Sequence, residues 1–226
     1  MYWFMFIAVA VLSYIVQAAL ENRFKKASGI ALANGMTGAE VAQKMLDDHA
    51  IRDVKIVCVS GKLTDHYNPV DKTLNLSESV YGRCSVAAAA VAAHECGHAV
   101  QHAYGYGPLK LRSSLVPVIN FSSRFMTILL LVGMLTINIF PKIMLAGIVL
   151  FAMTTLFAFV TLPVEINASS RALKWLDTAA VTDVDNHEEA RATLRSAAYT
   201  YVVAALSSLA TLIYYILIFT SGSRRS

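Results

Sequence analysis

The segment His94-Glu95-Cys96-Gly97-His98 has the residue types and spacing of an HExxH metal-binding motif. In an α-helix, residues four positions apart differ by about 40° around the axis and about 6 Å along it, so both imidazoles project from one face. Glu95 lies beside that pair, where it can hold a water molecule without binding the metal. The motif therefore predicts Zn²⁺ as the cofactor, one ion per chain, with His94 and His98 as ligands and Glu95 as the catalytic base.

The motif lies within a stretch that carries its own helix signals. Residues 85–104 are rich in alanine, Ser85 fits an N-cap, and a Gly-Tyr-Gly-Pro sequence beginning at Gly105 ends the pattern. These signals predict one continuous helix that presents both histidines on one side. The alternative interpretation is an ordinary helix with two surface histidines and no metal.

A catalytic zinc needs a third protein ligand and one open position. The extended metzincin motif would place a histidine at position 104, where this chain has Tyr104. His102 lies about 12 Å along the helix axis from His94, which is too far to share the ion. Glu165 is the best candidate, because it follows an apolar segment and two membrane crossings return the chain to the face of the motif. The alternative for Glu165 is a carboxylate that only anchors the segment at the membrane interface. Weaker rivals for the ligand role are Asp177, His187, Glu188 and Glu189.

Four apolar segments must position these residues. Hydrophobic residues make up 56% of the 226 residues and charged residues 15%, against roughly 25% charged in a typical soluble domain. Residues 2–20, 125–141, 143–164 and 196–223 contain no charged side chain, and a spanning helix needs about 20 apolar residues. The sequence predicts four transmembrane helices. The first is a retained anchor, because no Lys or Arg precedes it as in a signal peptide.

The basic residues predict the orientation of these helices. Lys and Arg lie in segments 21–124 and 165–195, with Lys142, Arg224 and Arg225 as the exceptions. The positive-inside rule therefore places residues 21–116 and 165–197 in the cytoplasm and both termini outside. Three scattered cysteines without a CxxC pair fit a reducing compartment. A net charge of +4 without a basic, aromatic-interleaved stripe argues against nucleic-acid binding.

The polar segment before the motif has the signals of a compact fold. Thr37 and Glu40 are spaced as a capping box, and Ser77 fits an N-cap. Residues 54–59 are rich in the β-branched residues Val and Ile, which predicts a strand. Residues 63–67 and 73–76 flank a turn-type cluster, which predicts a β-hairpin just before the HExxH helix.

Six short stretches of the chain resemble the membrane-bound neutral zinc metallopeptidase family. The matching stretches are residues 37–42, 63–69, 74–77, 92–102, 108–113 and 162–172. A more distant similarity is to gluzincin membrane proteases, whose third ligand is a glutamate in a Glu-x-x-Ala-Asp helix. Glu165 and Ala168 match that pattern, but Ser169 stands in place of the aspartate, which supports a histidine ligand. Ser169 or Asn167 must then supply that support. The resemblance implies a bacterial plasma-membrane peptidase with Glu165 as the third zinc ligand.

The predicted fold class is a mainly α membrane protein with four transmembrane helices and a small zincin-like cytoplasmic α+β part. In that part a β-hairpin lies beside the HExxH helix, 85–104. The predicted divisions are transmembrane helix 1 at 1–20, the cytoplasmic catalytic part at 21–116, a transmembrane hairpin of helices 2 and 3 at 117–164, cytoplasmic helices with the third ligand at 165–197, transmembrane helix 4 at 198–220 and a tail at 221–226.

The favoured function is a zinc-dependent endopeptidase in a bacterial plasma membrane, multi-pass, with its catalytic site facing the cytoplasm. Besides Glu95, the catalytic candidates are His66 and Arg171, which with Tyr67 can donate to the oxyanion. Arg171 could instead serve the lipid interface. The expected partners are a peptide or membrane-protein substrate and the lipid bilayer, with no nucleic acid; a homo-oligomer or a membrane-protein complex stays open.

Two other functions remain as alternatives. One is a non-catalytic membrane adaptor or quality-control partner that retains a structural zinc site. The other is a transporter or channel, which would need ionisable residues inside its spans. The apolar segments carry none, with Arg124 only at an edge, and this argues against transport.

Overall fold

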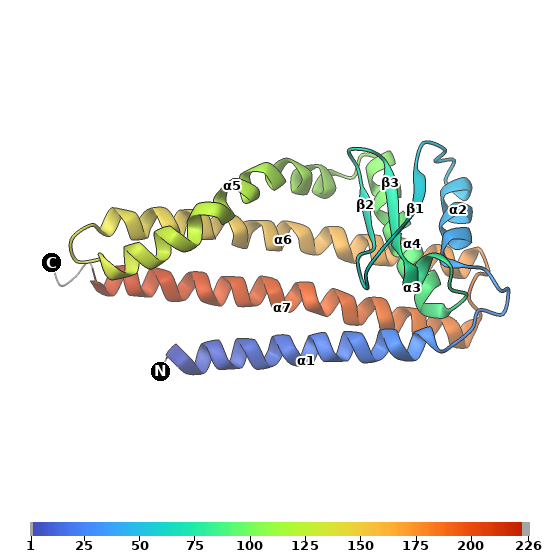
Figure 1. Ribbon diagram of the computed structural model, residues 1–226, viewed down its shortest axis with the longest axis horizontal. Helices are drawn as coiled ribbons and strands as arrows, with labels where there is room; N and C mark the ends of the chain where they lie inside the picture. The colour runs from blue at the N-terminus through green and yellow to red at the C-terminus, as the bar shows by residue number, and fades with distance from the viewer. Residues whose placement is uncertain (1, 223–226) are drawn as a thin grey trace.

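The computed structural model describes residues 2–222 and consists mainly of four long helices with a small three-stranded sheet at one end (Figure 1). The long helices are α1 (Tyr2–Ser28), α5 (Gly107–Leu135), α6 (Pro141–Thr178) and α7 (Val184–Gly222). They lie in the order α5, α6, α7, α1 in Figure 1. Residue 1 and residues 223–226, which include most of the predicted tail, lie outside the described residues.

All four long helices are apolar and long enough to cross a membrane, as the sequence predicts. At 1.5 Å per residue, the 38 residues of α6 and the 39 of α7 make each helix roughly twice as long as the hydrocarbon core of a bilayer is thick. Each therefore has an apolar part and a part that continues beside the sheet. The predicted limits at residues 164 and 197 fall inside these continuous helices, because the polar parts of the two helices, residues 165–178 and 184–196, contain helix-forming Ala, Glu, Leu and Arg and no Gly or Pro. The membrane limits themselves stay predictions.

The sheet contains β1 (Lys55–Val59), β2 (His66–Asn68) and β3 (Thr73–Ser77) in the order β1-β3-β2. β2 and β3 are antiparallel neighbours, with His66 opposite Asn75, whereas β1 pairs with β3 in parallel. β3 is therefore the central strand, and β2 is an edge strand. That edge contacts the HExxH helix α4 (Val86–Ala103).

Caps set where the short helices begin. Thr37 and Glu40 form the predicted capping box at the start of α2 (Gly38–Asp48), and Ser85 accepts a hydrogen bond from the amide of Ala88 at the start of α4. Ser77 precedes α3 (Glu78–Tyr81) but makes no side-chain cap. Ser77 is therefore the N-cap residue by position, as predicted, but its hydroxyl donates to Oδ2 of Asp65 and does not cap the helix.

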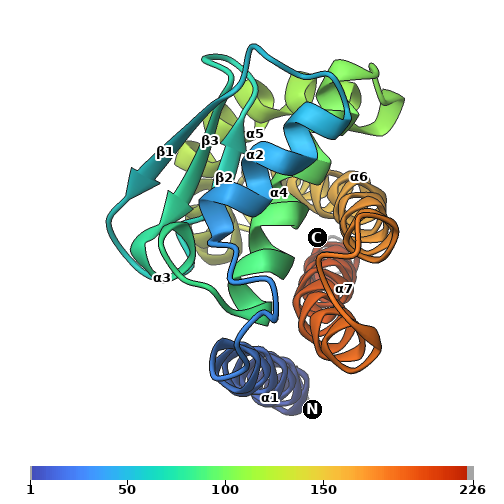
Figure 2. The ribbon, with the colours of Figure 1, turned by 90° about the vertical axis from the view of Figure 1, so that its right-hand side faces the viewer.

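The core is built around α4. Its alanines from Ala87 to Ala93 are all buried, and the helix packs against α2, α6 and α7. Small side chains allow these helices to approach closely, and Val41, Met45, Leu46, Leu74 and Leu76 fill the space between α4, α2 and the sheet. Figure 2 shows α4 between the sheet and the pair α6 and α7.

Candidate metal centre

Two helices meet closely at the predicted metal site. Gly97, in the middle of the motif, lies against α6: a Cβ added there would come 2.7 Å from the carbonyl oxygen of Ala168. Only a glycine permits this approach without moving backbone atoms. The contact places the histidine face of α4 directly against the turn of α6 that carries Glu165.

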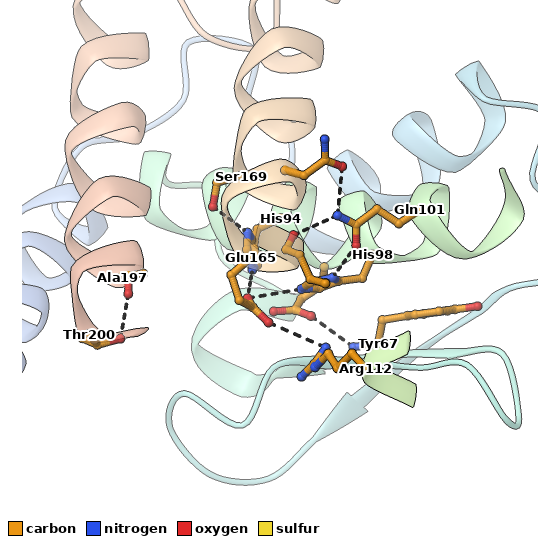
Figure 3. A network of polar contacts seen from close by, with 12 residues as sticks. Tyr67, His94, His98, Gln101, Arg112, Glu165, Ser169, Ala197 and Thr200 are labelled. Carbon is orange, nitrogen blue, oxygen red and sulfur yellow. Dashed lines mark hydrogen bonds and ion pairs between the residues drawn. The ribbon is translucent and has the colours of Figure 1, made fainter. Parts of the chain in front are cut away.

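The three predicted ligands converge at this contact, as Figure 3 shows. Oε2 of Glu165 lies 3.3 Å from Nε2 of His94 and 3.5 Å from Nε2 of His98. Their donor atoms all lie within 4.8 Å of one another, and the glutamate is almost completely buried, with 2% of its surface exposed. Residues 71 positions apart in the chain thus form a compact set of two imidazoles and one carboxylate.

Hydrogen bonds fix the orientation of the His98 ring. Its Nδ1 lies 3.1 Å from Oε1 of Gln101, and Nε2 of Gln101 donates to the carbonyl oxygen of Val164 at 2.8 Å and to Oδ1 of Asn167 at 3.0 Å. Because the amide nitrogen of Gln101 is used in those two bonds, its oxygen must accept from His98 Nδ1. A neutral His98 therefore directs the lone pair of Nε2 toward Glu165.

The His94 ring has a simpler support. The hydroxyl of Ser169 lies 3.0 Å from Nδ1 of His94, on the opposite side of the ring from Glu165 (Figure 3). Ser169 thus supports a histidine where the distant gluzincin pattern has an aspartate, and Asn167 contributes through Gln101 to the other histidine. Both residues that the sequence indicates for this support are in use.

This donor set fits a divalent cation. Oε2 of Glu165 is buried and has no hydrogen-bond partner among the described residues. An orphaned carboxylate oxygen that faces two imidazole nitrogens is costly unless a cation lies between them. Two nitrogens and one oxygen, with further positions open toward a cavity, match the ligand preference of catalytic Zn²⁺.

Glu95 lies next to the ligand set but does not join it. The backbone amide of Tyr67, on β2, donates to Oε2 of Glu95 at 3.1 Å. The Tyr67 hydroxyl lies 2.8 Å from Nδ1 of His102, and burial raises the pKa of this phenol to about 12. The Tyr67 phenol therefore stays protonated at neutral pH. Separately, the Tyr67 backbone amide holds the carboxylate of Glu95 beside the metal site.

A cavity of about 250 Å³ opens from the metal site; we call it the Glu95 cavity. Its lining comes from β2, α4, α5, α6 and α7, so it brings together segments that are distant in sequence. The lining residues are Asp65, His66, Tyr67, Pro69, Glu95, His98, Leu109, Arg112, Ser113, Val116, Glu165 and Tyr201.

Two of these residues were missed by the sequence analysis as site residues. Nη1 of Arg112 lies 3.6 Å from Oε1 of Glu165, and Tyr201 of α7 lines the same cavity. Arg112 offered only a weak signal, as one of several basic residues near a predicted span. Tyr201 offered none, because an aromatic residue within an apolar segment looks like any membrane-facing side chain.

The two predicted oxyanion donors have different positions. His66 lines the Glu95 cavity, and its Nδ1 donates to the carbonyl oxygen of Thr64 at 2.8 Å, which leaves Nε2 available. Arg171 does not line that cavity: its Nε donates to Oδ1 of Asn167 at 2.8 Å, and its guanidinium lies 6.0 Å from the ring of Tyr106. The structure brings His66, but not Arg171, to the cavity.

The rival ligands are also distant from the site. Asp177 and His187 line a separate pocket between α6 and α7. Glu188 pairs with Arg191, and Glu189 pairs with Lys26 of α1. Among the described residues, His94, His98 and Glu165 form the one group of three histidine, cysteine or acidic residues close enough to hold a metal.

Four helices that are long and apolar enough to cross a membrane, together with a group of two histidines and one carboxylate beside Glu95, define a candidate membrane protein with the donor set of a zinc hydrolase. Comparison with known proteins gives the particular family. Residues 2–220 match the model of the family described as "Putative neutral zinc metallopeptidase", and the chain belongs to this family. It is 41% identical to the "Putative membrane protease YugP" of Bacillus subtilis over 219 residues, which cover 97% of this chain and 96% of that protein. No solved structure shows significant similarity to the chain.

Proposed function

We propose that this protein is a multi-pass, zinc-dependent endopeptidase that cleaves peptides or membrane proteins at the cytoplasmic face of a bacterial plasma membrane. The observation that carries the proposal is the convergence of His94, His98 and Glu165 next to Glu95 at a cavity bounded by an edge strand. A purely structural zinc site is usually closed by four protein ligands. Here the group contains three protein ligands, and two of them, His98 and Glu165, line a cavity beside Glu95, which favours catalysis over the adaptor alternative.

The chain's own residues supply the proton transfers. When bound by His94, His98 and Glu165, zinc supplies Lewis acidity that lowers the pKa of a water molecule toward about 7. Glu95 is held beside that position by the amide of Tyr67, so its free carboxylate oxygen can accept the proton of the attacking water. Glu95 then gives this proton to the leaving amine.

The developing negative charge on the scissile carbonyl needs donors. The polar side chains that line the Glu95 cavity and can donate include His66, Arg112 and Tyr201. Arg171 takes a different part in the proposal. It donates to Asn167, which accepts from Gln101, and Gln101 accepts from His98; Arg171 therefore helps to orient a ligand and does not contact the substrate.

The position of β2 suggests how the substrate binds. β2 has one neighbour in the sheet, β3, and its other side borders the Glu95 cavity. An extended peptide can add to such an edge by main-chain hydrogen bonds, which tolerate different side chains. The scissile bond would then lie across Glu95 and the metal ligands.

The arrangement of the helices supports the proposed topology. In Figure 1, α1 begins and α7 ends at the end of the helix bundle opposite the sheet. The loop between α5 and α6 lies at the same end. If the sheet end is cytoplasmic, as the distribution of Lys and Arg predicts, both termini are external.

The test separates zinc binding from cleavage. Purified full-length protein with Glu95→Gln should retain one zinc and lose peptide cleavage, because glutamine keeps the shape but cannot accept a proton. Glu78→Gln, at an exposed residue outside the cavity, is the matched control and should keep both properties. Comparative membrane proteomics of cells with wild-type or Glu95→Gln protein would then reveal accumulated substrates. Cleavage by the Glu95→Gln protein would refute the proposal, whereas wild-type protein with zinc and no substrate would favour the adaptor.

A further inference from the structure

A second pocket, the α6–α7 pocket, is separate from the Glu95 cavity. It has a volume of about 460 Å³ and lies between α6 and α7, which run side by side in Figures 1 and 2. Its charged and polar lining includes Lys174, Arg191, Arg195, Asp177 and His187. None of these residues takes part in the proposed proteolysis.

The charges in this pocket are poorly compensated. Three basic side chains face one carboxylate, and neither Lys174 nor Arg195 has an ion pair within 4.0 Å among the described residues. Arg191 pairs with Glu188 at 3.5 Å, but both side chains are mostly exposed, and such pairs contribute little. A pocket with excess positive charge attracts an anion.

One buried side chain is aimed at the same space. His187 is 9% exposed, and its Nδ1 lies 3.2 Å from the hydroxyl of Thr182. Its Nε2 has no hydrogen-bond partner among the described residues, although the ring lines the pocket. A buried imidazole with one nitrogen held in place and the other free can donate to, or accept from, a bound group.

The apolar part of the lining indicates where that group comes from. Ile166, Leu173 and Ala198 line the pocket beside the basic residues, and Ile166 is 49% exposed. The pocket starts where the uncharged segment 143–164 ends, and it extends toward the charged end of both helices. Basic pockets of this kind between membrane helices bind the headgroups of anionic lipids.

We propose that the α6–α7 pocket binds a phosphate group, that of an anionic phospholipid whose acyl chains lie along Ile166 and the apolar parts of α6 and α7. Arginine forks match phosphate oxygens bidentately, and lysine adds a point charge. Ser169 also lines this pocket while its hydroxyl contacts His94, so the bound group would lie one residue away from a metal ligand. The proposal concerns binding and does not depend on proteolysis.

The first experiment measures lipid binding to the full-length protein in detergent by native mass spectrometry. Phosphatidylglycerol and phosphatidylcholine are added separately to wild type, to Lys174→Gln/Arg195→Gln, and to Arg23→Gln/Lys25→Gln. The last variant removes the same charge from exposed positions on α1, outside the pocket. Wild type and the α1 variant should bind one phosphatidylglycerol in preference to phosphatidylcholine. The pocket variant should bind it about ten-fold or more weakly, since each basic contact at a lipid surface contributes on the order of 1 kcal/mol.

Two further arms identify the source of the phosphate. Inorganic phosphate that competes with phosphatidylglycerol at millimolar concentration would assign the pocket to soluble phosphates; no competition would assign it to lipid. A photoreactive phosphatidylglycerol should cross-link to residues 166–177 and 187–198 of wild-type protein, a measurement that does not depend on the folding of any variant. Equal binding to all three proteins, equal losses in both double variants, or cross-links confined to other segments would overturn the proposal.

Discussion

The two ends of α6 have different surroundings, although one helix forms both. Near the sheet, Glu165, Ala168 and Ala172 are buried against α4, and hydrogen bonds fix the neighbouring polar side chains. Near its start, α6 packs on α5 through Met144, while Leu145 and Val149 remain 44% and 54% exposed. At the metal end, the positions and chemical types of individual ligand atoms determine whether a metal can bind. At the apolar end, length, hydrophobicity and helix contact suffice.

The strongest test of this contrast is Glu165→Gln. The substitution removes the one ionised ligand and leaves an amide between two imidazoles, so zinc content of the purified protein should fall well below one ion per chain. Elemental analysis by mass spectrometry measures it. Glu188→Gln, on the exposed surface of α7, is the control and should retain zinc. Stoichiometric zinc in the Glu165→Gln protein would return Glu165 to the alternative role of a membrane-interface anchor.

A pair of glycine substitutions compares the two ends of α6 directly, one at the metal site and one at the apolar contact with α5. A Cβ at Gly97 would lie 2.7 Å from the carbonyl oxygen of Ala168, and a Cβ at Gly133 would lie 2.5 Å from Cα of Met144. Both Gly97→Ala and Gly133→Ala must move backbone atoms, so each should lower stability by about 1–3 kcal/mol. Only Gly97→Ala should also weaken zinc binding, because it separates α4 from α6 at the ligands.

The measurement for this pair combines thermal unfolding in detergent with zinc titration. Gly82→Ala is the control, since Gly82 has open space around its Cβ position. Equal zinc affinities in the Gly97→Ala and Gly133→Ala proteins would show that the close contact of α4 and α6 does not define the metal site.

The supports of the two ligand rings should have smaller effects. Removing a residue that orients a metal ligand typically weakens metal affinity by 10- to 100-fold. Gln101→Ala should approach the upper value, because it also removes the two hydrogen bonds that the Gln101 amide nitrogen donates to the carbonyl oxygen of Val164 and to Oδ1 of Asn167. Ser169→Ala removes one hydroxyl from His94 and should approach the lower value. Competition with a metal-binding dye measures both; a reversed order would contradict the proposed network.

The sequence was sufficient for the parts of the site that depend on local spacing. The positions of His94, Glu95 and His98 relative to one another follow from helix geometry. Glu165 was less certain from the residues alone, because the predicted topology permitted a ligand or an interfacial anchor, and the family resemblance favoured the ligand. The role of Gln101 was invisible, because its partners Val164 and Asn167 are remote in the chain.

The remaining failures have the same physical origin. The positions of Arg112 and Tyr201 depend on how α5 and α7 pack around α4, and such long-range packing leaves no periodic signal in one sequence. The predicted division at residue 164 marks the end of an apolar segment, and α6 continues through it because a change from apolar to polar residues does not by itself end a helix.

The smallest predicted effect lies in α2, remote from both ends of α6. Hydrogen bonds from Thr37 hold the pKa of Glu40 below its ordinary value, so the ionised carboxylate stabilises the folded state. This contribution is fully present above the pKa of an unfolded glutamate and is lost as the pH falls through the lower folded pKa. Glu40→Gln keeps the geometry of the capping box but not the charge.

The unfolding midpoint of the Glu40→Gln protein should therefore lie slightly below that of wild type at neutral pH, and the difference should shrink as the pH falls below the ordinary pKa of a glutamate, about 4.3. The comparison must use metal-free protein, because protonated histidines release zinc in the same range and would hide the change. Glu78→Gln, which has no capping box to lose, should show no such convergence. A difference that grows on acidification would mean that Glu40 is destabilising when ionised. The capping box would then owe its stability to the Thr37 side chain alone.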